Sequence, residues 1–282
     1  MMKKSIAACL CVKDCEKYLP SIFKNLDLLS KYYTLSCIFV YDNCSDNSEQ
    51  LIKQYKTESK HKVYIEKIVN NLSGRTIRIA KARNTCLDIV YNKIKTPDFH
   101  IMIDADDVNE KPWNINTINK YLQNDNNEWD ALSFNRTPYF DIWALLYDDI
   151  KHHCWGFGEH SKQIIDYMRK DISNKLKHST TDNIKCLSAF NGFAIYKTKR
   201  FRGIKYNGLY KNIKHFINDQ ERKTTLNLFK DQINKDVDII EPPILNPWKL
   251  SPKEDFICEH IYYHLSAIKN NKCVIKISKF CL

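Results

Sequence analysis

The chain has 282 residues, of which 43% are hydrophobic and 12% aromatic. This content is enough for a sizeable core and excludes a disordered chain, which is poor in aromatic residues. The net charge of +11 is compatible with binding nucleic acid, an anionic membrane surface or a phosphate-bearing substrate. The lysines are spread along the chain without a basic block, so we attribute most of the charge to a solvated surface and expect no nucleic-acid partner.

The cysteines and apolar segments bear on the cellular compartment. Eleven cysteines are scattered without a CxxC pair, which argues against a zinc ribbon or a disulfide framework. No apolar run approaches the roughly 20 residues of a membrane helix. The apolar stretch after Lys4 is short and runs into Lys13, so we interpret it as a buried strand rather than a signal peptide. We therefore expect a soluble, cytoplasmic protein without a transmembrane segment.

The first half alternates strand-like and helix-like segments. Short apolar runs predict strands, and apolar residues at helical spacing predict the helices between them. The predicted strands cover residues 5–12, 36–41, 62–68 and 99–103, and the predicted helices cover residues 17–29, 48–55 and 78–91. This alternation predicts an α/β fold with a mainly parallel sheet flanked by helices. Ligands of such sheets bind at the carboxyl ends of the strands, so Asp42 and Asp104 are expected in one crevice.

The second half is less regular. Its candidate strands cover residues 131–135 and 192–196, and its candidate helices cover residues 159–168 and 256–268. The polar, lysine-rich segment 159–183 is interpreted as a mobile helical excursion. We expect the second half to extend the same sheet.

The strongest chemical signal is the cluster Asp104-Ala105-Asp106-Asp107, directly after an apolar strand. Clustered carboxylates repel one another unless a cation lies between them. Hard divalent ions take oxygen ligands and share them with substrate phosphates, so Asp104 and Asp106 are expected to hold Mn²⁺ or Mg²⁺. The alternative is a solvated acidic turn that caps the next helix; the position after a strand favours the metal site.

Two further segments supply polar groups. Asp42 is suited to accept hydrogen bonds from a base or ribose, and Asp46 is suited to cap the following helix. Arg75 and Arg83 are placed to pair with a diphosphate or with Asp104. The alternative for Arg75 is an exposed basic helix face.

Together these motifs resemble those of the GT-A-fold glycosyltransferases, in particular the family-2-like enzymes. Residues 42–47 resemble their nucleotide-binding DDGSxD loop, with Asn43, Cys44 and Asn47 departing from it, and residues 104–107 resemble their DxD motif. Three further segments of this chain resemble those of a narrower group, the fungal capsule-associated mannosyltransferases and their relatives in large DNA viruses. These are the LAxxRN helix at residues 79–84, the YDxWxL segment at residues 139–145, with Phe140 inserted, and the GxxxY/F strand at residues 191–196.

The resemblance implies a metal-dependent hexosyltransferase that moves a sugar from a UDP-sugar or GDP-mannose to a hydroxyl of a glycan or glycoprotein. It implies one GT-A domain over residues 1–282, with a nucleotide-binding half (1–110) and an acceptor-binding half (111–282). The substrate-binding residues that it implies are Asp42, Arg75, Arg83, Asp104, Trp143, Asn191 and Gly192. Trp143 is equally compatible with a place in the core. Arg83 or Lys205 would assist the leaving group.

The family also has a late acidic ED pair that opens a helix and supplies a base. Glu259-His260 is the best match, with histidine in place of aspartate. The catalytic candidates are therefore Glu259, His260 and, on the YDxWxL segment, Asp141. His264 is a candidate metal ligand, and an ordinary surface histidine is the alternative.

Three other functions stay open. A nucleotidyltransferase is disfavoured because residues 10–18 lack the glycines of a phosphate loop. A basic nucleic-acid-binding protein would bind DNA or RNA with strong salt dependence. A catalytically inactive relative would bind glycans or nucleotide-sugars without hydrolysing them in the presence of metal.

Overall fold

The computed structural model describes residues 3–69, 71–72, 74–124, 128–239 and 256–282. The strands are β1 (Ser5–Val12), β2 (Thr34–Tyr41), β3 (Lys62–Lys67), β4 (Phe99–Asp104), β5 (Ala131–Asn135), β6 (Asn183–Cys186), β7 (Phe193–Lys197) and β8 (Ile275–Cys281). The α-helices are α1 (Leu19–Ser30), α2 (Ser48–Glu58), α3 (Arg75–Asn92), α4 (Ile115–Leu122), α5 (Ser161–His178), α6 (Asp219–Ile233) and α7 (Glu259–Asn271). None of these helices is long and apolar enough to cross a bilayer.

The described strands form one eight-stranded sheet in the order β3-β2-β1-β4-β7-β5-β8-β6. The first four are mutually parallel, and β7 runs antiparallel between β4 and β5. β8 is parallel to β5, and β6 is an antiparallel edge strand. This topology confirms the predicted α/β fold with a mainly parallel sheet flanked by helices, and it brings the carboxyl ends of β1, β2 and β4 together.

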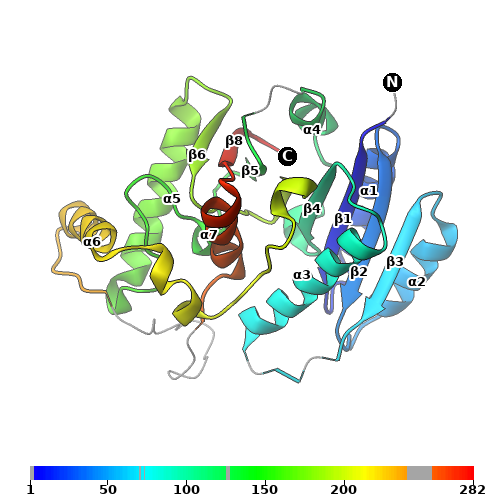
Figure 1. Ribbon diagram of the computed structural model, residues 1–282, viewed down its shortest axis with the longest axis horizontal. Helices are drawn as coiled ribbons and strands as arrows, with labels where there is room; N and C mark the ends of the chain where they lie inside the picture. The colour runs from blue at the N-terminus through cyan, green and yellow to red at the C-terminus, as the bar shows by residue number, and fades with distance from the viewer. Residues whose placement is uncertain (1–2, 70, 73, 125–127, 240–255) are drawn as a thin grey trace.

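Both faces of the sheet are covered, which explains why its central strands are apolar throughout. On β1, Ala7 and Cys9 face a core that includes α3, α5 and α7, while Ala8 and Leu10 face a core that includes α1, α2 and α4. Figure 1 shows α3 and α7 side by side on one face. The pairing of α3 with α7 brings residues far apart in the sequence over the same end of the sheet.

The predicted elements are present, most with ends shifted by a few residues. The helix predicted at 159–168 is α5, which continues to His178, so the segment 159–183 is helical as expected. It is not an excursion, because its Ile164, Met168, Ile172 and Leu176 are buried. Their four-residue spacing places them on one face of the helix, which packs into the core. Sequence reasoning missed α6, β6 and β8, and it named α4 only as the helix that the acidic turn would cap. In α6 the apolar signal is weak, because its buried residues are only Thr225 and Phe229.

A glycine links β7 to the loop after β4. Gly192 has φ 82°, and its carbonyl oxygen accepts hydrogen bonds from the Asp104 amide at 2.9 Å and from Asn109 Nδ2 at 2.8 Å. A Cβ at this position would lie 2.6 Å from Cγ1 of Val108. Glycine is therefore required here both by the backbone conformation and by the close approach of the Asp104 loop.

We expect Gly192→Ala to lower the free energy of unfolding by about 2–4 kcal/mol, since positive φ and overpacking both cost energy. The matched control is Gly203→Ala, because Gly203 also has φ 82° but a Cβ added there would meet no atom within 4 Å. The control variant therefore measures the cost of a side chain at positive φ without the steric contact. Urea denaturation compares the two variants, and equal losses would show that the contact with Val108 is unimportant.

Candidate active site

A cavity of about 800 Å³ opens at the carboxyl ends of β1, β2 and β4. Asp14 lines it after β1, Asp42 after β2, and Asp104 and Asp106 at and after β4. α3, α5, the start of α7 and the segment that follows β5 complete its wall. Asp42 and Asp104 thus share one crevice, where the strand order led us to expect them.

The loops after β1 and β2 are tied together by side-chain hydrogen bonds. Asp14 Oδ1 accepts from the Ser45 amide at 2.6 Å and from its hydroxyl at 3.0 Å. Asp46 accepts from the Glu16 amide at 2.9 Å and from the Ser48 amide at 3.0 Å. It thus satisfies the amide of the first residue of α2, although the N-cap position itself is Asn47. These bonds fix the two loops beside Asp42.

Asp14, Asp46 and Cys44 lie close enough to share a cation. The hydrogen bonds just described already engage both carboxylates and account for their proximity. We therefore assign no metal to this group.

Asp104 and Asp106 have the free oxygens that a metal site needs. Asp104 Oδ1 accepts from Arg83 at 3.0 Å, and Asp106 Oδ1 accepts from the Val108 amide at 3.2 Å. Neither Oδ2 has a hydrogen-bond partner among the described residues. Asp107 is exposed and does not line the cavity. Two adjacent carboxylates with one unbonded oxygen each suit a hard divalent cation that also takes phosphate and water oxygens.

The pKa values of the two carboxyl groups reflect this crowding. Burial raises the pKa of Asp104 to about 7, with Arg83 opposing the shift and Asp106 adding to it. Burial also raises the pKa of Asp106. A bound cation would favour the charged forms of both carboxyl groups.

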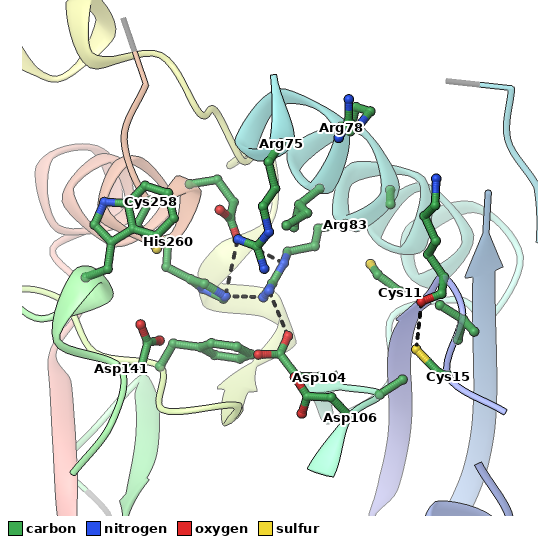
Figure 2. Close-up of a pocket in the computed structure, with 18 of the residues that line it drawn as sticks. Cys11, Cys15, Arg75, Arg78, Arg83, Asp104, Asp106, Asp141, Cys258 and His260 are labelled. Atoms are coloured by element: carbon green, nitrogen blue, oxygen red, sulfur yellow. Dashed lines mark hydrogen bonds and ion pairs between the residues drawn. The ribbon is translucent and has the colours of Figure 1, made fainter. Parts of the chain in front are cut away.

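Arg83 joins three elements beneath the cavity. This buried side chain of α3 pairs with Asp104 at 3.0 Å and with Glu259 at the start of α7 at 3.1 Å. It also donates from Nη1 to Nε2 of His260, and its guanidinium lies 4.5 Å from the centre of the Phe190 ring. Figure 2 shows Arg83 between His260 and Asp104. Although burial lowers it, the pKa of Arg83 is raised well above its ordinary value by Glu259 and Asp104.

His260 does not have a free basic nitrogen. Arginine only donates hydrogen bonds, so Nε2 of His260 must accept from Arg83 and its proton lies on Nδ1. Nδ1 is 3.4 Å from the Tyr196 hydroxyl. Burial and, as a smaller effect, the positive charge of Arg83 hold the pKa of His260 well below its ordinary value. We therefore interpret His260 as the residue that positions Arg83, and not as the expected base.

The structure also contradicts the prediction that His264 binds the metal. Its Nε2 is 3.1 Å from the Tyr196 hydroxyl, and its Nδ1 is 3.0 Å from the Ser188 hydroxyl. Burial lowers the pKa of His264 to about 3, and the residue does not line the cavity. His264 thus extends the hydrogen-bonded chain that begins at Arg83, inside the core.

The predicted site residues divide into those that line the cavity and those that do not. Nine of them line it, namely Asp42, Arg75, Arg83, Asp104, Asp106, Asp141, Trp143, Glu259 and His260. Asn191 and Gly192 do not, which corrects their expected contact with substrate. Asn191 Oδ1 instead accepts from the amides of Phe140 and Asp141, at 3.3 and 3.2 Å. Lys205 is also absent from the cavity, because it pairs with Asp88 on the surface.

Sequence reasoning missed several residues of the cavity. Lys13 and Asp14 come directly after the first predicted strand, and Arg78 comes directly before the LAxxRN segment, so these positions were the available signal. Trp155 and Arg169 lie outside all the motifs named above, and nothing in the sequence around them marked them.

The sequence model of the protein family Glycosyl transferase family 2 matches residues 7–199, which is more than half of the 282 residues. The chain belongs to glycosyl transferase family 2. The match covers the strand-end carboxylates described above and confirms the family-2 resemblance and the GT-A type of fold. No curated protein sequence matches this family 2 member significantly.

Solved structures similar to this family 2 member include three transferases. The first is mannosyltransferase PcManGT from Pyrobaculum calidifontis in complex with GDP-Man and Mn²⁺, with 12% sequence identity and a TM-score of 0.41 over 73% of this chain and 48% of that chain. The second is M. tuberculosis glucosyl-3-phosphoglycerate synthase, with 11% identity and a TM-score of 0.43 over 83% of this chain and 68% of that chain. The third is S. aureus TarS 1-349 in complex with UDP-GlcNAc, with 14% identity and a TM-score of 0.42 over 84% of this chain and 55% of that chain. The chain thus spans about half the length of the first of these proteins. At these identities the likeness concerns the fold alone.

We expect Arg83→Met to lower the free energy of unfolding by about 3–5 kcal/mol, because it leaves Asp104 and Glu259 without their buried cation. Lys205→Met is the control, since its pair with Asp88 is about half exposed and should contribute at most about 1 kcal/mol. Denaturant titration at neutral pH measures both variants. A loss for Arg83→Met no larger than that of the control would contradict the central role of Arg83.

Proposed function

We propose that this family 2 member is a metal-dependent hexosyltransferase that moves a sugar from a nucleotide-diphosphate sugar to a hydroxyl of a glycan or glycoprotein. The observation that carries the proposal is the convergence on one cavity of Asp42, after β2, with Asp104 and Asp106, at the end of β4. In this proposal residues 1–110 bind the donor, and residues 111–282 form the acceptor side.

The nucleoside would lie against the tied loops at Asp14 and Asp42. The diphosphate would lie near Arg75 and Arg78, which line the cavity at the first turn of α3. A helix N-terminus favours an anion, and the charge of Arg75 already acts on Asp106. The resemblance of residues 79–84 and 139–145 to capsule-associated mannosyltransferases supports testing GDP-mannose beside UDP-sugars.

Asp104 and Asp106 would hold the metal through their unbonded oxygens. When bound there, Mn²⁺ or Mg²⁺ would supply Lewis-acid stabilisation of the diphosphate leaving group. Arg83 fixes the orientation of Asp104 through Oδ1, which leaves Oδ2 for this role. The chain therefore positions the ligands before the donor arrives.

Asp141 is the candidate base that the geometry supports best. Glu259 and His260 are both engaged by Arg83, whereas Asp141 forms no ion pair with a described residue. Its carboxylate accepts from the amides of Ala144 and Asn191, both at 3.3 Å, which fixes its orientation at the cavity. Burial raises the pKa of Asp141 to about 6, with the Ala144 amide opposing the shift. A carboxylate with this pKa is ionised at neutral pH and suited to take the proton of an attacking hydroxyl.

We expect Asp106→Asn to weaken Mn²⁺-dependent binding of the donor at least about tenfold, because a charged ligand oxygen is lost. The amide oxygen can still cap the Val108 amide, so the fold should be preserved. Asp107→Asn is the matched control, since Asp107 is adjacent but exposed and outside the cavity. Calorimetric titration with UDP-glucose and GDP-mannose, with and without Mn²⁺, measures the effect. Unchanged affinity in Asp106→Asn would contradict the metal assignment.

We expect Asp141→Asn to lower kcat about 10²–10⁴-fold while the donor still binds, since an amide cannot take a proton. In the wild type, kcat/KM for Mn²⁺-dependent donor hydrolysis should fall about tenfold per pH unit below pH 6, because the base becomes protonated there. Assays of released nucleoside diphosphate between pH 5 and 8 measure both effects. The assays use saturating Mn²⁺, because protonation of Asp104 would otherwise weaken metal binding at low pH. If kcat/KM of Asp141→Asn still falls below pH 6 under these conditions, the base is another residue. Donor binding without turnover in the wild type would indicate an inactive relative.

A further inference from the structure

Part of the cavity is lined by aromatic side chains that the proposed donor and metal sites do not use. Phe140 and Trp143 follow β5, and Trp155 comes from the next loop. Ile165 and Arg169 of α5 also line the cavity, and the hydrogen bond of Arg169 to the Tyr139 carbonyl places Arg169 beside residues 140–143. We call Trp143, Trp155 and Arg169 the aromatic subsite. Asp141 lies in the same stretch of chain as Trp143, so the subsite adjoins the candidate base.

The two indole rings of the subsite lack aromatic neighbours. Trp113 and Trp129 pack against Phe193 and Phe99 in the core. Among the described residues no aromatic ring contacts Trp143 or Trp155, although both are half-buried in the cavity wall. Both tryptophans also pack against the hydrophobic core, so each offers a ligand in the cavity the part of its ring that the core leaves uncovered.

The subsite also holds a polar donor without a partner. That donor is not Nε1 of Trp143, which makes no hydrogen bond to a described residue but has almost no accessible surface and therefore does not face the cavity. Arg169 donates from Nε to the Tyr139 carbonyl at 3.0 Å and from Nη1 to Asp166 at 3.3 Å. These two bonds hold the guanidinium in place, and its Nη2 has no partner among the described residues.

We propose that the aromatic subsite binds a pyranose ring of the acceptor. A pyranose has an apolar face of C–H groups and a rim of hydroxyls, so its face fits an indole while a hydroxyl accepts from Arg169 Nη2. A purely aliphatic acceptor would leave this donor unsatisfied. The inference rests on the proposed transferase function, because the bound ring presents a hydroxyl to Asp141.

The chemistry of the step is a direct displacement. The acceptor oxygen forms a bond to the anomeric carbon of the donor sugar as the bond from that carbon to the diphosphate oxygen breaks. The acceptor proton goes to the Asp141 carboxylate, and the nucleoside diphosphate leaves with the electron pair. The aromatic subsite takes no part in bond making and acts by holding the acceptor ring.

The test compares transfer to a sugar with transfer to water. Wild type, Trp155→Ala, Trp155→Phe and Arg169→Met are assayed with Mn²⁺ and UDP-glucose or GDP-mannose. Methyl glycosides of glucose, mannose, galactose, xylose and N-acetylglucosamine serve as acceptors, because the methyl group cannot itself stack on an indole. We expect Trp155→Ala and Arg169→Met to lower the ratio of transfer to hydrolysis at least about tenfold, mainly through the acceptor KM, since water needs no stacking.

Two controls separate stacking from general damage. Trp155→Phe keeps an aromatic face and should retain most of the transfer ratio. Tyr32→Ala removes an exposed aromatic side chain outside the cavity and should leave transfer and hydrolysis unchanged. Equal ratios in Trp155→Ala and wild type would overturn the subsite, and so would donor hydrolysis in the wild type without transfer to any of the glycosides.

Failure of the proposed function has a different signature. In that case the wild type neither binds nor hydrolyses the donors with Mn²⁺. Direct binding then tests the subsite alone, by quenching of tryptophan fluorescence with the same methyl glycosides. We expect quenching in the wild type and its loss in Trp155→Ala; no quenching in the wild type overturns the subsite independently of the donor.

Discussion

The cavity depends on one buried positive charge, the guanidinium of Arg83. Arg83 pairs with Asp104 at the end of β4 and with Glu259 at the start of α7, and it donates to His260 in the next position of the same helix. A buried guanidinium is tolerated only where several acceptors surround it. The same contacts hold α3, the sheet and α7 together. The requirement to pair this charge therefore also fixes the positions of the candidate metal ligands and of the chain segment beside the candidate base.

The chain of hydrogen bonds behind Arg83 has a defined direction. His260 accepts from Arg83 and offers its Nδ1 proton to Tyr196, whose hydroxyl reaches His264 and, through it, Ser188. Burial keeps the pKa values of both histidines low, so the rings stay neutral and each link has one donor and one acceptor. A histidine pair that looked catalytic in the sequence thus supports the arginine that orients the site.

Local patterns in the sequence predicted most of the fold and half of the site. Strand-end carboxylates such as Asp42 and Asp104 could be located because strand–turn–helix alternation places them at one edge. The roles of His260 and His264 could not, because burial and partners decide whether an imidazole is basic, and these depend on contacts with residues 64 or more positions away. Arg169 was missed for a related reason: only the packing of α5 against the core turns a polar, lysine-rich segment into a cavity wall.

The placement of two arginines on α3 has a further consequence. Arg75 lies at the first turn beside the expected diphosphate, and Arg83 lies two turns later under Asp104. A rigid helix separates them by about 12 Å along its axis, and adding or removing a single residue between them would rotate one relative to the other by about 100°. Length variation within this stretch is therefore incompatible with the site, whereas the loops on either side of α3 are under no such restriction of register.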